Sequence, residues 1–274
     1  MPKNKLQLAA AAALGVLIST SAVPAATIDL GFAIDESGSI NTTELATMRQ
    51  GFAAAMDLIP SVGAPNNPNT YRVSIVVFAS GASTIVAPTV IDDTTRASVK
   101  STILNHTRIS GGTNIPSSID LLTKLLCGDG TTIGTCGADT TLFNVATDGF
   151  GGDPTTSANP NAVTAGVDGI SYEAIGSGAN LTGLKGFAFP GTPVIVDLAN
   201  GDTIPDPTKT GFVVKVAGFD DFEDAIKAKV GKIVTDTGGG GVVPVPASFP
   251  LLLAGFGAIA GMGAIRRRKA RQTA

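Results

Sequence analysis

The sequence predicts an α/β fold, a doubly wound and mainly parallel sheet with helices on both faces. Between residues 27 and 235, apolar segments rich in β-branched residues alternate with segments of helical periodicity. The chain has 274 residues, of which 43% are hydrophobic, so it can bury a sizeable core. Polar residues follow several of the predicted strands, where ligands bind in sheets of this kind.

Seven segments have the β-rich composition of strands. Ser80, Gly81 and Ala82 separate the second from the third, which favours a hairpin, and a turn rich in Gly, Pro and Asp joins the last two as a pair. The predicted strands span residues 27–35, 71–79, 83–91, 140–148, 170–176, 192–199 and 211–217.

Helical periodicity lies between these strands. Asn41, Thr42 or Thr43 can cap the first helix, which ends before Pro60. The last helix has Phe222, Ile226, Val230 and Ile233 on one face, as expected for a helix packed on a sheet. The predicted helices span residues 41–59, 94–106, 115–126 and 219–234, with a short one inside 154–169.

The amino-terminal segment is typical of a secretory signal peptide. Lys3 and Lys5 precede a short apolar run and then small residues, which predicts cleavage after Ala25 and a signal peptide over residues 1–25. The run is too short to span a bilayer comfortably, so a retained anchor is the weaker interpretation.

The carboxyl-terminal segment predicts a membrane anchor. A Gly-rich linker over residues 236–242 leads into the segment 243–271, whose apolar part, 248–265, is just long enough to cross a bilayer. A basic cluster follows, which should stop transfer and remain in the cytoplasm: Arg266, Arg267, Arg268 and Lys269.

The negative charge of the domain argues against nucleic acid as a partner. The formal net charge is −3, but without both ends the chain keeps 12 basic and 22 acidic residues, a net charge of −10. Such a domain repels phosphate backbones, so we expect no nucleic-acid partner and an affinity for cations.

Cys127 and Cys136 flank a short loop rich in Gly and Thr. In an exported protein an even pair at this spacing favours a local disulfide. The alternative is a metal site, but two thiols without a nearby histidine supply too few soft ligands.

The segment Asp35-Glu36-Ser37-Gly38-Ser39 lies between the first strand and the first helix. Asp35, Ser37 and Ser39 offer hard oxygen donors, which suit Mg²⁺, Mn²⁺ or Ca²⁺. The same residue types also cap helices, so the segment alone allows either role. Two later residues at comparable positions favour a site: Thr113 follows a Gly-Gly turn, and Asp148 ends a buried strand.

Three short motifs follow one another along the chain: Asp-x-Ser-x-Ser at 35–39, Gly-Gly-Thr at 111–113 and Thr-Asp-Gly at 147–149. In their order and spacing they resemble the metal-ion-dependent adhesion site of the von Willebrand factor type A domain, a family that includes the integrin inserted domain. The resemblance covers residues 27–235, although 178–210 fits poorly and is interpreted as an insertion near the sheet edge.

That resemblance implies a Rossmann-like fold and a function. Ser37, Ser39 and Thr113 would bind the cation through their hydroxyls, with Asp35 and Asp148 binding directly or through water. Mg²⁺ is the first expectation, with Mn²⁺ and Ca²⁺ as alternatives. A cation with few charged ligands still attracts an anion, so a partner's carboxylate would complete its coordination.

The tail resembles the PEP-CTERM class of sorting segments, in its Val-Pro-x-Pro-Ala variant, found on exported proteins of Gram-negative bacteria. The residues that carry this resemblance are Val243, Pro244, Val245, Pro246 and Ala247. It implies recognition by an exosortase and a membrane association that is at least transient; a plain single-span anchor is the alternative.

Other candidate sites are weaker. A Ser-His-Asp hydrolase would need His106, the only histidine, which is interpreted as a solvated residue at a helix end. The adjacent acids Asp92 and Asp93 stand where a helix begins, which is typical of caps. Asp129 and Asp206 lie in loops without the spacing of a calcium loop, so turn formation is favoured.

We therefore expect an exported, non-enzymatic protein of the cell surface, outer envelope or extracellular matrix. Its domain would bind a divalent cation and, through it, a protein or other ligand that offers a carboxylate. A structural component of an envelope or biofilm matrix, in which the cation only stabilises the loops, is the alternative; a hydrolase comes third.

Overall fold

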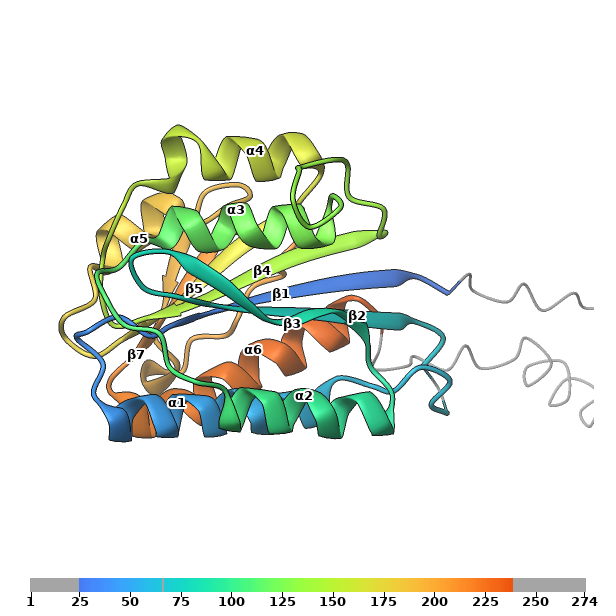
Figure 1. Ribbon diagram of the computed structural model, residues 1–274, viewed down its shortest axis with the longest axis horizontal. Coiled ribbons are helices and arrows are strands. Elements are labelled where there is room, and N and C mark those ends of the chain that lie inside the picture. Colours follow the sequence, from blue (N-terminus) through green and yellow to red (C-terminus); the bar gives the residue numbers. More distant parts are fainter. Residues whose placement is uncertain (1–24, 66, 239–274) are drawn as a thin grey trace, which may run out of the picture. The chain divides into compact units, whose positions relative to one another are not determined.

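The computed structural model describes residues 25–65 and 67–238, which form a seven-stranded sheet between two layers of helices (Figure 1). The strand order is β3-β2-β1-β4-β5-β7-β6. The strands are β1 (Thr27–Asp35), β2 (Thr70–Phe78), β3 (Ala82–Val90), β4 (Thr140–Thr147), β5 (Gly169–Ile175), β6 (Val194–Val196) and β7 (Phe212–Val216).

All neighbouring strands run parallel except β2 and β3, which form the predicted hairpin. The last two strands pair as expected, but in parallel. The predicted strand over 192–199 shortens to the three residues of β6, because Pro193 cannot donate to a ladder and a 3₁₀ turn begins at Leu198. The structure thus confirms the predicted mainly parallel sheet.

The helices lie close to their predicted positions, with one addition. The segment 178–210, expected to be an insertion, contains a helix of seven residues, α5, which covers the sheet near β5 and β7. The helices are α1 (Thr42–Ala55), α2 (Asp93–Asn105), α3 (Ile115–Leu126), α4 (Ala158–Ala165), α5 (Leu181–Phe187) and α6 (Phe222–Asp236), and single 3₁₀ turns span Met56–Leu58, Pro154–Thr156, Leu198–Asn200 and Phe219–Asp221.

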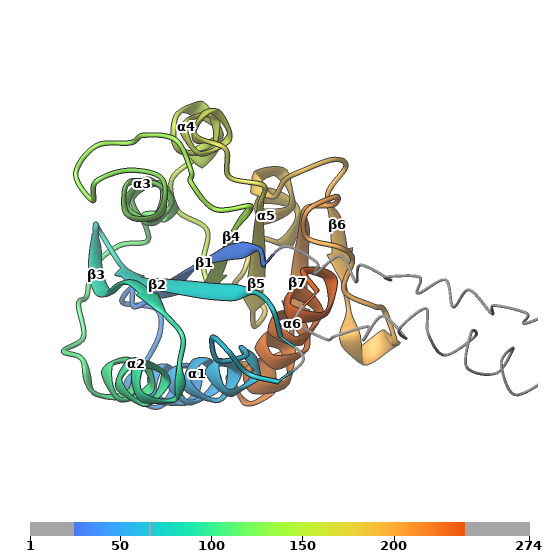
Figure 2. The same ribbon diagram turned by 90° about the vertical axis from the view of Figure 1, so that its right-hand side faces the viewer.

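Each face of the sheet has its own core. Helices α1, α2 and α6 cover one face around Phe32, Phe52 and Phe222, whereas α3, α4 and α5 cover the other around Phe143 and Tyr172 (Figure 2). Parallel strands buried on both faces explain why the sequence shows continuous apolar runs rather than strict alternation.

Neighbouring strands β1 and β4 lead in opposite directions along the sheet. After β1 the chain continues through α1 to β2 on one side, and after β4 it continues through α4 to β5 on the other. The carboxyl ends of β1 and β4 therefore flank the point where the strand order reverses, the usual ligand position in an open α/β sheet.

The two ends of the described domain meet at the opposite edge of the sheet. Asn69 accepts a hydrogen bond from Ala26 N (3.1 Å) through Oδ1, and its Nδ2 donates to Thr237 O (2.6 Å). Helix α6 extends to Asp236, the first residue of the predicted linker, and the ion pair between Lys232 and Asp236 supports its last turn.

The predicted signal peptide, apart from Ala25, and the predicted sorting and membrane segment 243–271 lie outside the described residues. Within the part of the chain that the structure describes, no helix is long and apolar enough to cross a membrane.

Candidate metal centre

The segment after β1 does not cap the next helix. Asn41 does so instead: its Oδ1 accepts hydrogen bonds from Thr43 N (2.9 Å) and Glu44 N (3.0 Å), and its own backbone N donates to Glu44 Oε2 (2.8 Å). Because this capping box satisfies the start of α1, the oxygens of Asp35, Ser37 and Ser39 are available for another role.

Asp35 is fully buried at the end of β1 and joins it to β4. Its Oδ1 accepts a hydrogen bond from Ser37 N (2.8 Å), and its Oδ2 accepts one from Thr147 Oγ1 (2.6 Å). The first bond folds the chain back after the strand, which turns Ser37 and Ser39 towards the end of β4.

The two serine hydroxyls and Asp148 form a continuous chain of contacts. Ser37 Oγ lies 3.1 Å from Ser39 Oγ, and Ser39 Oγ donates to Asp148 Oδ1 (2.8 Å). Asp148 directly follows β4, so adjacent parallel strands bring together residues that are 109 positions apart in the sequence.

Thr113 comes from the loop between α2 and α3, which is tied to both of the other segments. Gly38 N donates to Gly111 O (2.9 Å), and Ile115 N donates to Gly151 O (3.1 Å). A Cβ at Gly149 would lie 3.3 Å from Thr113 Oγ1, so the hydroxyl lies beside the loop of Asp148. The structure thus brings all three predicted segments together.

The electrostatics of this group suit a cation. Burial raises the pKa of Asp35 against the hydrogen bonds from Thr147 and Ser37, and the nearby charge of Asp148 raises it further. Burial also raises the pKa of Asp148, although the hydrogen bond from Ser39 lowers it. Neither carboxylate has an ion-pair partner among the described residues. Two carboxylates near one another, neither of them in an ion pair, favour a bound cation.

The donor set fits a hard ion. Two carboxylates and three hydroxyls are oxygen ligands of the kind that Mg²⁺, Mn²⁺ and Ca²⁺ prefer. Within the described residues there is no group of three or more His, Cys, Asp or Glu side chains that could hold a metal ion, so a site here depends on hydroxyl donors.

Glu36, for which the sequence predicted no role, anchors the loop that carries Ser37 and Ser39. Its fully buried carboxylate lies 2.5 Å from both Arg49 Nη2 and His106 Nε2, and it accepts a hydrogen bond from Ile109 N (2.9 Å). Burial alone would raise the pKa of Glu36, but the hydrogen bonds from His106 and Arg49 outweigh this and lower it. Arg108 Nη2 donates to the carbonyl of Ser37 (2.7 Å) and also fixes this loop.

His106 is therefore not the solvated residue that the sequence analysis expected. Its side chain is only 8% exposed, because Glu36 and Arg49 lie against its ring. Its Nδ1 faces the carbonyls of Thr102 and Ile103 at the end of α2. Among the described residues, the hydrogen-bond partners of the ring are Glu36, Arg49 and the carbonyls at the end of α2, and none is a serine hydroxyl.

The cysteine pair and three of the weaker candidate acids have the structural roles that the sequence predicted for them. Cys127 and Cys136 form a disulfide at the end of α3. Asp92 caps α2, and Asp129 and Asp206 each accept hydrogen bonds from the backbone two residues on, as turn residues do.

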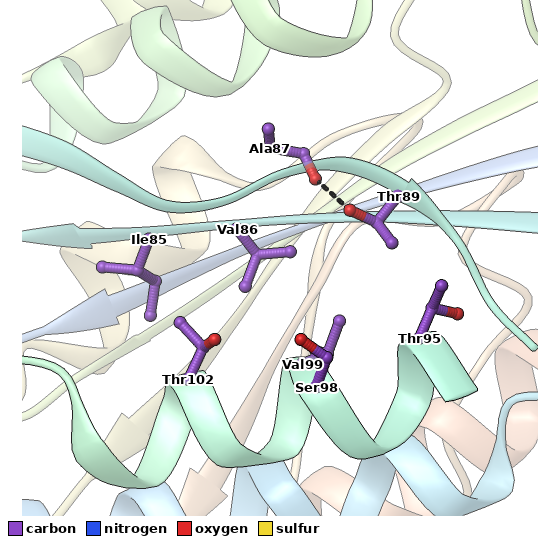
Figure 3. Close-up of a pocket in the computed structure, with 8 residues that line it drawn as sticks. All are labelled: Ile85, Val86, Ala87, Thr89, Thr95, Ser98, Val99 and Thr102. Carbon is purple, nitrogen blue, oxygen red and sulfur yellow. Dashed lines mark hydrogen bonds between the residues drawn. The ribbon is translucent and has the colours of Figure 1, made fainter. Parts of the chain in front are cut away.

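A groove between β3 and α2 is lined by none of the five candidate metal residues (Figure 3). Its walls present methyl groups and four hydroxyls but no acid or base. The hydroxyls belong to Thr89, Thr95, Ser98 and Thr102.

Comparisons with known proteins agree with the fold. A family model for the von Willebrand factor type A domain matches residues 30–135. No curated protein sequence matches the chain.

Solved structures with the same fold include proximal thread matrix protein 1 from the mussel byssus, at 18% identity and a TM-score of 0.56 over 76% of this chain and 48% of that one. A second structure of that protein has a zinc-occupied metal-ion-dependent adhesion site and matches at 18% identity, with a TM-score of 0.57 over 78% of this chain and 49% of the other.

A von Willebrand factor type A protein from Catenulispora acidiphila matches at 13% identity and a TM-score of 0.55, over 76% of this chain and 42% of that one. The chain thus spans about half the length of these structures or less. Residues 30–135 match the von Willebrand factor type A domain in sequence, and the described domain shares the fold of a solved protein of that type.

Proposed function

We propose that this domain binds a divalent cation, Mg²⁺ first, at a metal-ion-dependent adhesion site made of Asp35, Ser37, Ser39, Thr113 and Asp148. The observation that carries the proposal is the convergence of three distant segments at the carboxyl ends of β1 and β4. Three of the five donors are neutral hydroxyls, so the bound ion keeps positive charge.

That residual charge gives the domain its binding function. A bound cation would supply the positive charge that attracts a carboxylate from a partner protein. The domain's own residues supply the cradle: Asp35 folds the loop, Arg108 holds its carbonyls, and Asp148 closes the site from β4.

The path of the chain suits surface display. Both ends of the domain meet at Asn69, at the amino-terminal ends of the strands, whereas the metal residues lie at their carboxyl ends. The described domain therefore ends, at Thr237, on the side of the sheet opposite to the metal residues. The disulfide and the signal and PEP-CTERM-like segments support an exported protein, processed by an exosortase and placed at the cell surface or in a matrix.

The likeness in fold to a thread matrix protein favours the same broad setting, and it makes a structural cation the second candidate. In that case the ion would only neutralise Asp35 and Asp148 and stabilise the three loops.

Isothermal titration calorimetry with Mg²⁺ and Mn²⁺ tests the site directly. Thr113→Val removes the hydroxyl while keeping the side-chain shape, and it should weaken cation binding. Ser110→Ala is a matched control, because Ser110 is exposed in the same loop. Equal affinity in Thr113→Val and in the control would refute the site.

Adhesion separates the two candidates. The wild-type domain should bind cells or matrix of its own source in Mg²⁺ and release them in chelator. If chelator lowers only the melting temperature, and cell binding is absent with Mg²⁺ present, the cation is structural.

A further inference from the structure

Three polar side chains are buried together on the sheet face that α6 covers. They are Asn144 on β4, Glu173 on β5 and Lys229 on α6, and each is at most 2% exposed. Asn144 pairs with Ser171 and Ala146 pairs with Glu173, so Asn144 and Glu173 are diagonal neighbours on the same face. Nothing in the proposed metal site uses these groups.

The contacts place Glu173 between the other two side chains. Lys229 Nζ lies 2.8 Å from Glu173 Oε1 and 5.2 Å from the centre of the Phe212 ring. The Asn144 amide approaches the same carboxyl closely enough to lower its pKa. Yet none of the terminal oxygens and nitrogens of the three side chains has a well-aligned hydrogen bond among the described residues. Buried polar groups are nearly always satisfied, so this cluster requires an explanation.

Burial pushes both ionisable groups towards their neutral forms. It raises the pKa of Glu173 against the opposing charge of Lys229, and it lowers the pKa of Lys229 against the charge of Glu173. A proton shared by the pair thus favours the carboxylic acid and the free amine. The cluster then brings a nucleophilic amine, a primary amide and a carboxylic acid together in the buried core.

We propose that Lys229 and Asn144 join in an intramolecular isopeptide bond, with Glu173 as the group that transfers protons. The lone electron pair of Lys229 Nζ attacks Asn144 Cγ, and the new C–N bond forms as the amide oxygen takes the negative charge. Glu173 donates its proton to the Asn144 nitrogen and takes one from Lys229 Nζ. The C–N bond of the amide breaks, and ammonia leaves. The products are a Lys–Asn amide, ammonia and Glu173 in its starting state, so no oxidant or cofactor is consumed.

The buried cluster favours this reaction in a way that water does not, because it provides an unprotonated amine and a nearby acid. A lysine in water is protonated and its encounter with an amide is bimolecular, whereas here the amine is desolvated and held beside a proton donor. General acid catalysis by Glu173 assists the loss of ammonia, the step for which an amide is a poor substrate.

Such a bond would tie the central strand β4 to α6, the last helix of the domain. Asp148, in the proposed metal site, follows β4 directly, and α6 ends at Asp236 shortly before the tail. Force between a ligand and the tail would then pass through a covalent link. The bond itself does not depend on the proposed function, and it can be tested without any ligand.

Mass spectrometry of the exported or recombinant full chain, reduced and denatured, tests the proposal. We expect a mass lower by about 17 Da than the sequence requires, the loss of one ammonia. After trypsin, peptide 125–185 should be joined to peptide 228–232, because an acylated Lys229 blocks cleavage. Suppose instead that the protein has folded and is then denatured and digested. A mass equal to that of the sequence, together with tryptic cleavage after Lys229, would overturn the proposal.

Variants assign the roles. The variants Lys229→Met, Asn144→Ala and Glu173→Gln should not lose ammonia, so each should have the full mass of its sequence. All three should also migrate more slowly than wild type in denaturing gels, because they lack the cross-link. Lys227→Met is the matched control, since Lys227 is a partly exposed residue of the same helix and should leave the mass loss intact. Ammonia loss from Glu173→Gln at the wild-type rate would refute its role. If a variant does not fold, the wild-type peptide map still decides whether the bond exists.

Discussion

Ser39 Oγ donates a hydrogen bond of 2.8 Å to Asp148 Oδ1 across 109 residues of sequence. The bond joins the loop after β1 to the loop after β4, and it brings a hydroxyl and a carboxylate to the point where the strand order reverses. Both side chains therefore face one small region, which is the proposed cation site.

Asp148→Asn should weaken cation binding, because it removes one of two carboxylates while keeping the side-chain shape. We expect the dissociation constant for Mn²⁺, measured by calorimetry, to rise by about 10–100-fold. Asp153→Asn is the matched control: Asp153 is exposed, five residues further on, and its carboxylate only accepts hydrogen bonds of its own turn. An unchanged constant in Asp148→Asn would remove Asp148 from the site.

Cation affinity should also decrease on acidification, and the decrease should begin at a higher pH than the ordinary pKa of aspartate predicts. The pKa values of Asp35 and Asp148 are both raised above 3.8, chiefly by burial, and a proton on either carboxylate competes with the ion. Affinity should therefore be full at neutral pH and decrease as the pH falls through the raised values, by up to about tenfold per unit for each proton displaced. Titrations between neutral and acid pH test this; affinity that stays constant down to the ordinary aspartate range contradicts it.

The convergence of the three segments could be predicted from the sequence because each stands next to a recognisable element. Asp35 ends β1, Asp148 directly follows β4 and Thr113 precedes α3, and a parallel sheet gathers such positions at one edge. The roles of Glu36 and His106, in contrast, depend on contacts that only the three-dimensional structure shows. The contact between Glu36 and His106 spans 70 residues, and nothing in either local segment indicates it.

The segment 178–210 was hard to interpret for a different reason. Helix α5 has seven residues with two glycines, Gly183 and Gly186, and β6 has three residues, so neither gives a clear periodicity. Their packing on β5 and β7 determines their conformation. Likewise, Asn144, Glu173 and Lys229 follow no motif, and only the structure brings them together.

Glu36→Gln should destabilise the domain, because it leaves Arg49 buried without its anionic partner. We expect the free energy of unfolding to fall by about 2–4 kcal/mol. Glu223→Gln breaks an exposed ion pair with Lys227 and should cost less than about 0.5 kcal/mol. Urea denaturation of both variants measures the difference, and equal stability of the two would contradict the role given to Glu36.

The effect of Glu36 should depend on pH in a defined direction. Its pKa in the folded protein lies below the ordinary 4.5, so the charged form stabilises the fold. This stabilisation is complete above pH 4.5 and is lost as the pH falls through the lowered pKa. The stability difference between wild type and Glu36→Gln should therefore shrink in acid; a difference that grows in acid would reverse the assignment.

The disulfide should stabilise the domain without affecting the metal site. Cys127 follows the last residue of α3, while the Thr113 loop precedes the first, so the bond lies at the far end of the helix. Closing a loop between residues nine positions apart is worth about 2–3 kcal/mol by the entropy that it removes from the unfolded chain. The Cys127→Ser, Cys136→Ser double variant should unfold at correspondingly lower urea and bind Mn²⁺ as wild type does. Reductant should lower the stability of the wild type and leave the double variant unchanged, whereas an effect of reductant on both would show that it acts elsewhere than on this bond.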